Sequence, residues 1–124
     1  MALVIGKKST RKIKVTAEEP LDFAGVNRHV FDVEFKLLSE SELNGITEMS
    51  NAGEEEVALD GIFGSIVDVQ GVKDESGTDI PFSTDLVEAL RETVWVRRAI
   101  NQFFWSVQRG VTQPELYKAL KAKN

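Results

Sequence analysis

The stretch that decides the fold is "HVFDVEFKLLSESEL", residues 29–43. In its first half, charged residues alternate with the apolar residues Phe31, Val33, Phe35 and Leu37. Alternation with a period of two predicts a strand that buries one face. The pattern changes at Ser39, because Ser39 and Glu42 have the spacing of a capping box that opens a helix. The stretch therefore predicts a sheet that passes directly into a helical part.

A second alternating segment, "RKIKVT" at residues 11–16, precedes this stretch. Its lysines lie on the face opposite Ile13 and Val15, which is typical of an exposed edge strand. The twelve residues 17–28 that separate the two strands are long for a hairpin loop. We therefore expect a small antiparallel sheet whose connection folds back into the core through three apolar residues, Leu21, Phe23 and Val26.

Helical and turn signals dominate after the sheet. A second helix is expected to begin near Gly53, because three glutamates at 54–56 suit the positive end of a helix dipole. The segment "DGIFGS" at 60–65 is expected to be a helix end and turn, and "SIVDVQGV" at 65–72 an extended segment. A longer helical segment follows residue 83, and a short helix is expected at 113–123.

The segment "GVKDESGTDIPFS" at 71–83 is rich in acids but does not have the alternate-position spacing of a calcium loop. Its Asp-Glu-Ser-Gly order is typical of a polar turn, in which short side chains bond their own backbone and glycine adopts positive φ. Ser83 or Thr84 is then positioned to cap the next helix.

These patterns predict an α+β fold, with a small N-terminal antiparallel sheet or hairpin followed by a predominantly helical C-terminal half. A chain of 124 residues suits a single domain over residues 1–124. Within it we expect a flexible basic arm at 1–10, the sheet at 11–38 and mainly helix at 39–124. The chain has no cysteine, which excludes disulfides and thiolate metal sites. No targeting segment and no apolar run of membrane-spanning length is expected.

The charges are distributed unevenly. Residues 1–16 carry five bases and no acid, residues 17–96 carry all but one of the acids, and residues 97–124 are basic again. The complementary patches suggest self-association, although a solvated surface with a basic terminus explains them more simply. Nucleic-acid binding is not favoured, because the pI is 4.9 and dedicated binding domains usually exceed about 9.

The segment "WVRRAINQFFWSVQRG" at 95–110 is the most informative for function. On a helix, its apolar residues share one face, whereas Trp105 falls among the polar residues opposite. Large apolar side chains on a polar face mark a contact with another element or another chain, and both readings stay open for Trp105. The predicted partner-binding residues on and around this stripe are Val94, Trp95, Arg97, Arg98, Asn101, Phe104 and Trp105.

Catalytic motifs are scarce. The one histidine, His29, lies inside a strand pattern without an obvious nucleophile or carboxylate partner, so a surface role is favoured over that of a base. There is no glycine-rich phosphate loop and no nucleophile elbow. We therefore expect a non-enzymatic protein with no catalytic residue, no cofactor and no metal.

The order of the later segments resembles the tail assembly chaperones of long-tailed bacteriophages. An extended segment is followed by the acidic turn with "IPFS" at 80–83, then a helix, then an aromatic residue with "VRRA" at 96–99 leading into an aromatic-rich helix. The resemblance covers about residues 60–108. One departure is the absence of proline in "RETVWV" at 91–96, a break that is often marked by proline in the family.

The resemblance implies a non-enzymatic role in the cytoplasm of the bacterial host. Such proteins bind the long, helical tape measure protein, keep its apolar segments soluble and help deliver it to the tail tip for polymerisation of tail tube subunits. They are absent from the mature virion. A structural tail tube or connector protein of a phage or prophage, and a small nucleic-acid-binding regulator acting through residues 1–16, are the alternatives.

Overall fold

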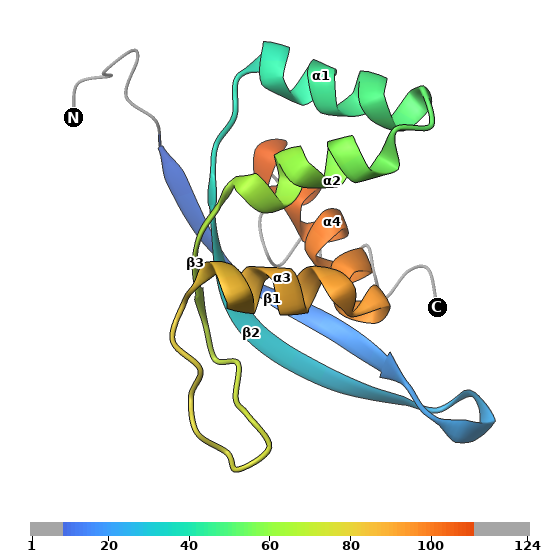
Figure 1. The fold of residues 1–124 in the computed structure, drawn as a ribbon, viewed down its shortest axis with the longest axis vertical. Helices are drawn as coiled ribbons and strands as arrows, with labels where there is room; N and C mark the ends of the chain where they lie inside the picture. Colours follow the sequence, from blue (N-terminus) through green and yellow to red (C-terminus); the bar gives the residue numbers. More distant parts are fainter. Residues whose placement is uncertain (1–8, 111–124) are drawn as a thin grey trace.

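The computed structural model describes residues 9–110 and has an α+β fold, as predicted. The helices lie together on one side of a sheet whose first two strands run far beyond them (Figure 1). In chain order, the elements are β1 (Thr10–Pro20), a 3-10 turn η1 (Asp22–Ala24), β2 (Val26–Lys36), α1 (Glu40–Asn51), α2 (Glu55–Gly64), β3 (Ile66–Gln70), α3 (Thr84–Glu92) and α4 (Val94–Gln108).

The sheet has three antiparallel strands in the order β1-β2-β3. β1 and β2 pair along their whole length, from Thr10 opposite Lys36 to Pro20 opposite Val26. β3 pairs only with the last part of β2, so the sheet is three-stranded at one end and a two-stranded ribbon at the other. The sheet therefore extends beyond the predicted range 11–38. Its third strand, β3, is the extended segment that the sequence predicted after the second helix.

The core lies between the inner face of this sheet and the helices, chiefly α4. Ile13, Val15 and Val33 are buried on the sheet, and the Phe35 ring meets the Phe104 ring of α4 edge to face at 5.8 Å. Polar groups also fix α4 to the sheet. The side chain of Gln108 donates to the Lys36 carbonyl at 2.7 Å and accepts from the Leu38 N–H at 2.9 Å. These bonds satisfy backbone groups where β2 ends.

The helix starts predicted at Ser39 and at Ser83 or Thr84 are confirmed. Ser39 accepts from the Glu42 backbone N–H, and Glu42 accepts from the Ser39 backbone N–H, which completes the capping box of α1. Ser83 caps α3 by accepting from the Leu86 backbone N–H at 3.1 Å. At the end of α4, Gly110 takes a positive φ of 74° and donates to the Val107 carbonyl, as expected of a C-terminal glycine.

The helices α3 and α4 separate without a proline. Thr93 adopts an extended conformation, with φ −89° and ψ 107°, and serves as the C-cap of α3 and the N-cap of α4. Just before this break, Arg91 ties α3 to α2 through bonds to the Asp60 carboxylate at 2.6 Å and the Glu56 carboxylate at 2.9 Å. The Asp60 carboxylate, with a smaller contribution from Glu56, raises the pKa of Arg91 above its ordinary value.

The prediction for the connection between β1 and β2 is wrong. Most of its twelve residues belong to the two strands, which continue to a tight turn, so no long loop folds back over the sheet. The turn consequently lies at the end of the ribbon (Figure 1), and the large apolar residues beside it are exposed. The exposed residues that were predicted to enter the core are Leu21, Phe23 and Val26.

Two further predictions concern the chain ends. β1 already begins at Thr10, inside the predicted basic arm, and the Ser9 carbonyl accepts from the Leu37 N–H. The rest of that arm, and the predicted helix at 113–123, lie outside the described residues.

Candidate partner-binding groove

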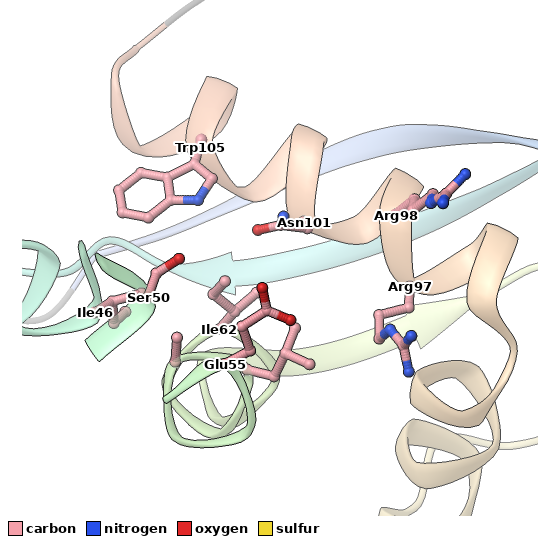
Figure 2. Close-up of a pocket in the computed structure, with 10 residues that line it drawn as sticks. Ile46, Ser50, Glu55, Ile62, Arg97, Arg98, Asn101 and Trp105 are labelled. Atoms are coloured by element: carbon pink, nitrogen blue, oxygen red, sulfur yellow. The ribbon is translucent and has the colours of Figure 1, made fainter. Parts of the chain in front are cut away.

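A small groove lies between α4 and the helix pair α1–α2, and Figure 2 shows the side chains that line it. α4 forms one wall, and the C-terminal half of α1 forms the other together with α2. We call this the α4 groove. Its lining residues are Ile46, Ser50, Glu55, Ala58, Leu59, Ile62, Arg97, Arg98, Asn101 and Trp105.

Trp105 is the largest side chain of the α4 groove and is held from two sides. Its ring meets the buried Phe104 ring edge to face at 5.1 Å, and the Arg109 guanidinium lies 5.6 Å from the Trp105 ring centre. The tryptophan remains only partly buried, and it lies on the side of α4 that faces Ile46 and Ser50 (Figure 2). Trp105 therefore offers a preordered apolar surface, whose immobilisation costs little further entropy when a partner binds.

Asn101 lies one helical turn before Trp105 and carries an unsatisfied polar atom. Among the described residues, its Oδ1 is buried without a hydrogen-bond donor. A buried acceptor without a donor costs roughly 1–3 kcal/mol, so this amide lowers the stability of the fold at the groove wall.

Two arginines extend the α4 groove toward the start of α4. Arg97 is partly buried and donates to the Arg91 carbonyl at 3.4 Å, whereas Arg98 is exposed at the rim. Glu55 of α2 lies on the opposite wall (Figure 2). The α4 groove therefore presents donors along α4 and an acceptor across from them, with apolar surface between.

The volume of the α4 groove, about 230 Å³, limits what it holds. Small-molecule sites usually measure about 300–1,000 Å³. The α4 groove suits one or two side chains of a macromolecular partner better than a separate ligand.

The structure brings together four of the seven residues that the sequence singled out, namely Arg97, Arg98, Asn101 and Trp105. The other three lie elsewhere. Val94 is exposed at the start of α4 but does not line the groove, and Trp95 packs on His29 with ring centres 5.3 Å apart. Phe104 is fully buried against the sheet, so it is a core residue and offers no surface to a partner.

Sequence reasoning missed a second, more apolar groove on the other side of α1 and α2, with a volume of about 550 Å³. Three glycines leave room there, and the predicted turn "DGIFGS" in fact places two of them, Gly61 and Gly64, inside α2. The signal that could have predicted this groove was the spacing of Gly61 and Gly64, three residues apart on one face of α2, together with Gly45 on α1. The full lining is Lys36, Leu38, Glu42, Gly45, Ile46, Met49, Val57, Asp60, Gly61, Gly64 and Ser65.

Within residues 9–110, no cluster of three or more acidic or histidine side chains is arranged to hold a metal ion. His29 contacts Glu19 at 2.9 Å on the exposed part of the ribbon. None of the helices described is both long and apolar enough to cross a bilayer. Comparison of the chain with protein-family models, curated proteins and solved structures finds no match.

Proposed function

We propose that this protein is a tail assembly chaperone of a long-tailed phage or prophage, which binds the tape measure protein in the host cytoplasm before tail tube assembly. One structural observation supports the proposal most. The polar stripe of α4, singled out from the sequence, lines a groove against α1 and α2 and contributes a partly exposed tryptophan to it. The resemblance of residues 60–108 to such chaperones supplies the identity of the partner.

The α4 groove suits a helical partner with an apolar stripe. Helix-in-groove recognition inserts side chains spaced three or four apart into an apolar channel. An apolar side chain of the partner packs on Trp105, and an acid reaches Arg98. Anchors of these common types allow many similar segments of a long helical protein to bind in turn.

The second groove makes the proposed surface broader. It shares Ile46 with the α4 groove, so the two grooves adjoin at α1. Exposed Met49 and Val57 lie along it. Methionine adapts its shape to different partners, which suits a surface that binds several related segments.

The test is co-purification of the chain with the long helical protein encoded beside it. Trp105→Ala is expected to weaken the complex by roughly 30-fold, because a tryptophan anchor contributes about 2 kcal/mol or more to an interface. The matched control is Gln102→Ala, since Gln102 is exposed on α4 and does not line the groove. Thermal unfolding of both variants separates loss of binding from loss of folding.

Arg98→Glu provides a second variant, because Arg98 is exposed and its replacement leaves the core intact. It is expected to weaken the complex and to reverse its salt dependence. Equal binding by the native chain, Trp105→Ala and Arg98→Glu would exclude the α4 groove as the binding surface. Recovery of the chain in purified particles would favour a structural tail protein, and salt-sensitive DNA binding that requires residues 1–16 would favour a regulator.

A further inference from the structure

The ribbon formed by β1 and β2 continues beyond the helices, as Figure 1 shows. We call residues 16–30 the outer hairpin. The last residue that the body buries on it is Ala17, and every residue from 21 to 30 is exposed. Isolated two-stranded hairpins are at best marginally stable in water, so such a projection is expected to gain stability from a contact.

Apolar side chains are concentrated on the outer hairpin. Phe23 at the tip is fully exposed, and three others are about half exposed: Leu21 at 50%, Val26 at 49% and Val30 at 54%. These are four of the nine large apolar side chains that are exposed among the described residues. Clustered apolar exposure marks an interaction surface more often than scattered exposure does.

The turn itself is unfavourable for a free loop. Phe23 and Ala24 both have positive φ, 59° and 64°, although neither is glycine. Bulky residues rarely adopt this left-handed conformation, whereas asparagine and glycine adopt it readily. Neither folding nor solubility of the single chain accounts for a phenylalanine at this position, and strained residues of this kind concentrate at functional sites.

The outer face of the ribbon, turned away from the helices, carries a regular charge pattern. Lys14 on β1 pairs with Asp32 on β2 at 3.1 Å. Two pairs further along, Glu18 on β1 pairs with Arg28 on β2 at 3.4 Å, so the sign on each strand reverses. The uncharged pair Thr16 and Val30 lies between them.

We propose that the outer hairpin is a homodimer surface, in which the outer faces of two ribbons pack together with their tips side by side. A two-fold axis along the ribbon places each β1 residue over the β2 residue that it pairs with in its own chain. Glu18 then faces Arg28 of the second copy, and Lys14 faces Asp32 of the second copy. Facing sheets pack about 10 Å apart, a distance that long side chains span.

The same axis places Val30 over Thr16 and Val26 over Pro20 of the second copy, so apolar side chains contribute to the contact. The exposed Val30 and Val26 lie on this outer face, and Phe23 at the tip lies close to the axis, where it meets Phe23 of the second copy. Such an isologous contact closes after two copies, because the same patch serves both partners.

The charges favour this symmetric homodimer over a head-to-tail contact between two copies. A tip inserted into the apolar groove of α1 and α2 would bring Asp22 and Glu19 toward Glu42 and Asp60, which line that groove and outnumber its one base, Lys36. Like charges placed together oppose association. The outer face, in contrast, is complementary to its own copy.

The first test measures the oligomeric state of the full chain by sedimentation across micromolar to millimolar concentration. The native chain is expected to dimerise, and Phe23→Asn to raise the dimer dissociation constant at least tenfold. The same variant is expected to unfold at an equal or higher temperature when monomeric, because asparagine tolerates positive φ. A native chain that stays monomeric, or dimers of unchanged affinity in Phe23→Asn, would overturn the proposal.

Two further variants test the geometry. Arg28→Glu opposes two acids across the interface and is expected to weaken the dimer, whereas the double variant Glu18→Arg, Arg28→Glu restores it. Because the chain has no cysteine, Phe23→Cys is expected to form a disulfide between two copies on mild oxidation. Phe82→Cys, exposed in the loop before α3, is the control that stays uncrosslinked. Crosslinking at both positions alike, or failure of the double variant to recover, contradicts the arrangement.

The proposed dimer is independent of the α4 groove. The Trp105→Ala variant is expected to remain dimeric. In the Phe23→Asn variant, each chain is expected to bind the tape measure protein as a monomer. If the tape measure protein instead protects the outer hairpin and no dimer is found, the surface belongs to that partner and the homodimer proposal is wrong.

Discussion

The inner and outer halves of the β1–β2 ribbon have the same pairing but opposite surroundings. In the inner half, alternate residues such as Val15, Val33 and Phe35 are fully buried beneath α4. In the outer half, the register continues without interruption, but Val26 and Val30 lie on the face turned away from the helices and are exposed. Strand pairing is therefore the same in both halves, and a side chain becomes core only where it lies on the inner face and a helix covers it.

The largest expected effect tests this difference directly. Phe35→Ala is expected to lower the free energy of unfolding by about 3–5 kcal/mol, because it removes a buried ring and its contact with Phe104. Phe23→Ala, which removes the same ring from the tip, is expected to change it by less than about 0.5 kcal/mol in the monomer. Urea unfolding at low protein concentration measures both.

A large loss of stability in monomeric Phe23→Ala would show that the tip contacts the body, contrary to the exposed position described above. A small loss in Phe35→Ala would instead show that the inner half is not the core of the molecule.

The contrast also explains which parts of the fold the sequence predicted. The capping box at Ser39 and the helix cap at Ser83 are local, because each bond joins residues three apart, and both were predicted correctly. The exposure of Phe23, in contrast, depends on how distant parts of the chain pack. The twelve residues that join the two alternating segments are long for a hairpin loop, so their apolar side chains were predicted to enter the core. The prediction was wrong because the two strands continue through most of these residues.

In the candidate groove, too, the features that depend on one helix were predicted, and those that depend on packing between elements were not. Helical periodicity placed Arg98, Asn101 and Trp105 on one stripe, because that depends on α4 alone. It could not show that Phe104, at the margin of the apolar face, packs against Phe35 of a strand far away in the sequence. Nor could it show that α1 and α2 form the opposite wall, since that depends on how the helices pack.

A second prediction concerns how closely α1 and α2 pack in that wall. A Cβ at Gly61 would lie 2.8 Å from the Ile46 Cγ1, which is too close without movement of α1 against α2. Gly61→Ala is therefore expected to destabilise the fold by about 1–2 kcal/mol. At Gly64, three residues along the same helix, a Cβ meets nothing within 4 Å, so Gly64→Ala is expected to be neutral or slightly stabilising.

Thermal unfolding of the two alanine variants provides the comparison. Equal behaviour of Gly61→Ala and Gly64→Ala would mean that α1 moves freely on α2, in which case both grooves change shape readily. Partner binding by Gly61→Ala then shows whether a fixed wall is needed.

The prediction with the smallest expected effect concerns a comparison of two tight turns, one at residues 74–78 and one at Phe23. The turn at 74–78 has the chemistry that the tip at Phe23 lacks. Gly77 takes its positive φ of 82°, and the Asp74 carboxylate accepts from the Ser76 hydroxyl at 2.7 Å, the Ser76 N–H at 2.9 Å and the Thr78 N–H at 3.0 Å. These bonds, the Ser76 hydroxyl first among them, lower the pKa of Asp74 from its ordinary value of 3.8.

A carboxylate with a lowered pKa stabilises the folded state above its ordinary pKa, and this contribution is lost as the pH falls through the lowered value. Ser76→Ala removes the largest cause, so the Asp74 pKa is expected to rise toward 3.8, as followed by NMR titration of the carboxyl carbon. An unchanged pKa would mean that the backbone donors alone hold the carboxylate. In either case, the turn at 74–78 is satisfied by its own residues, whereas the turn at Phe23 gains its full stability only from a second surface.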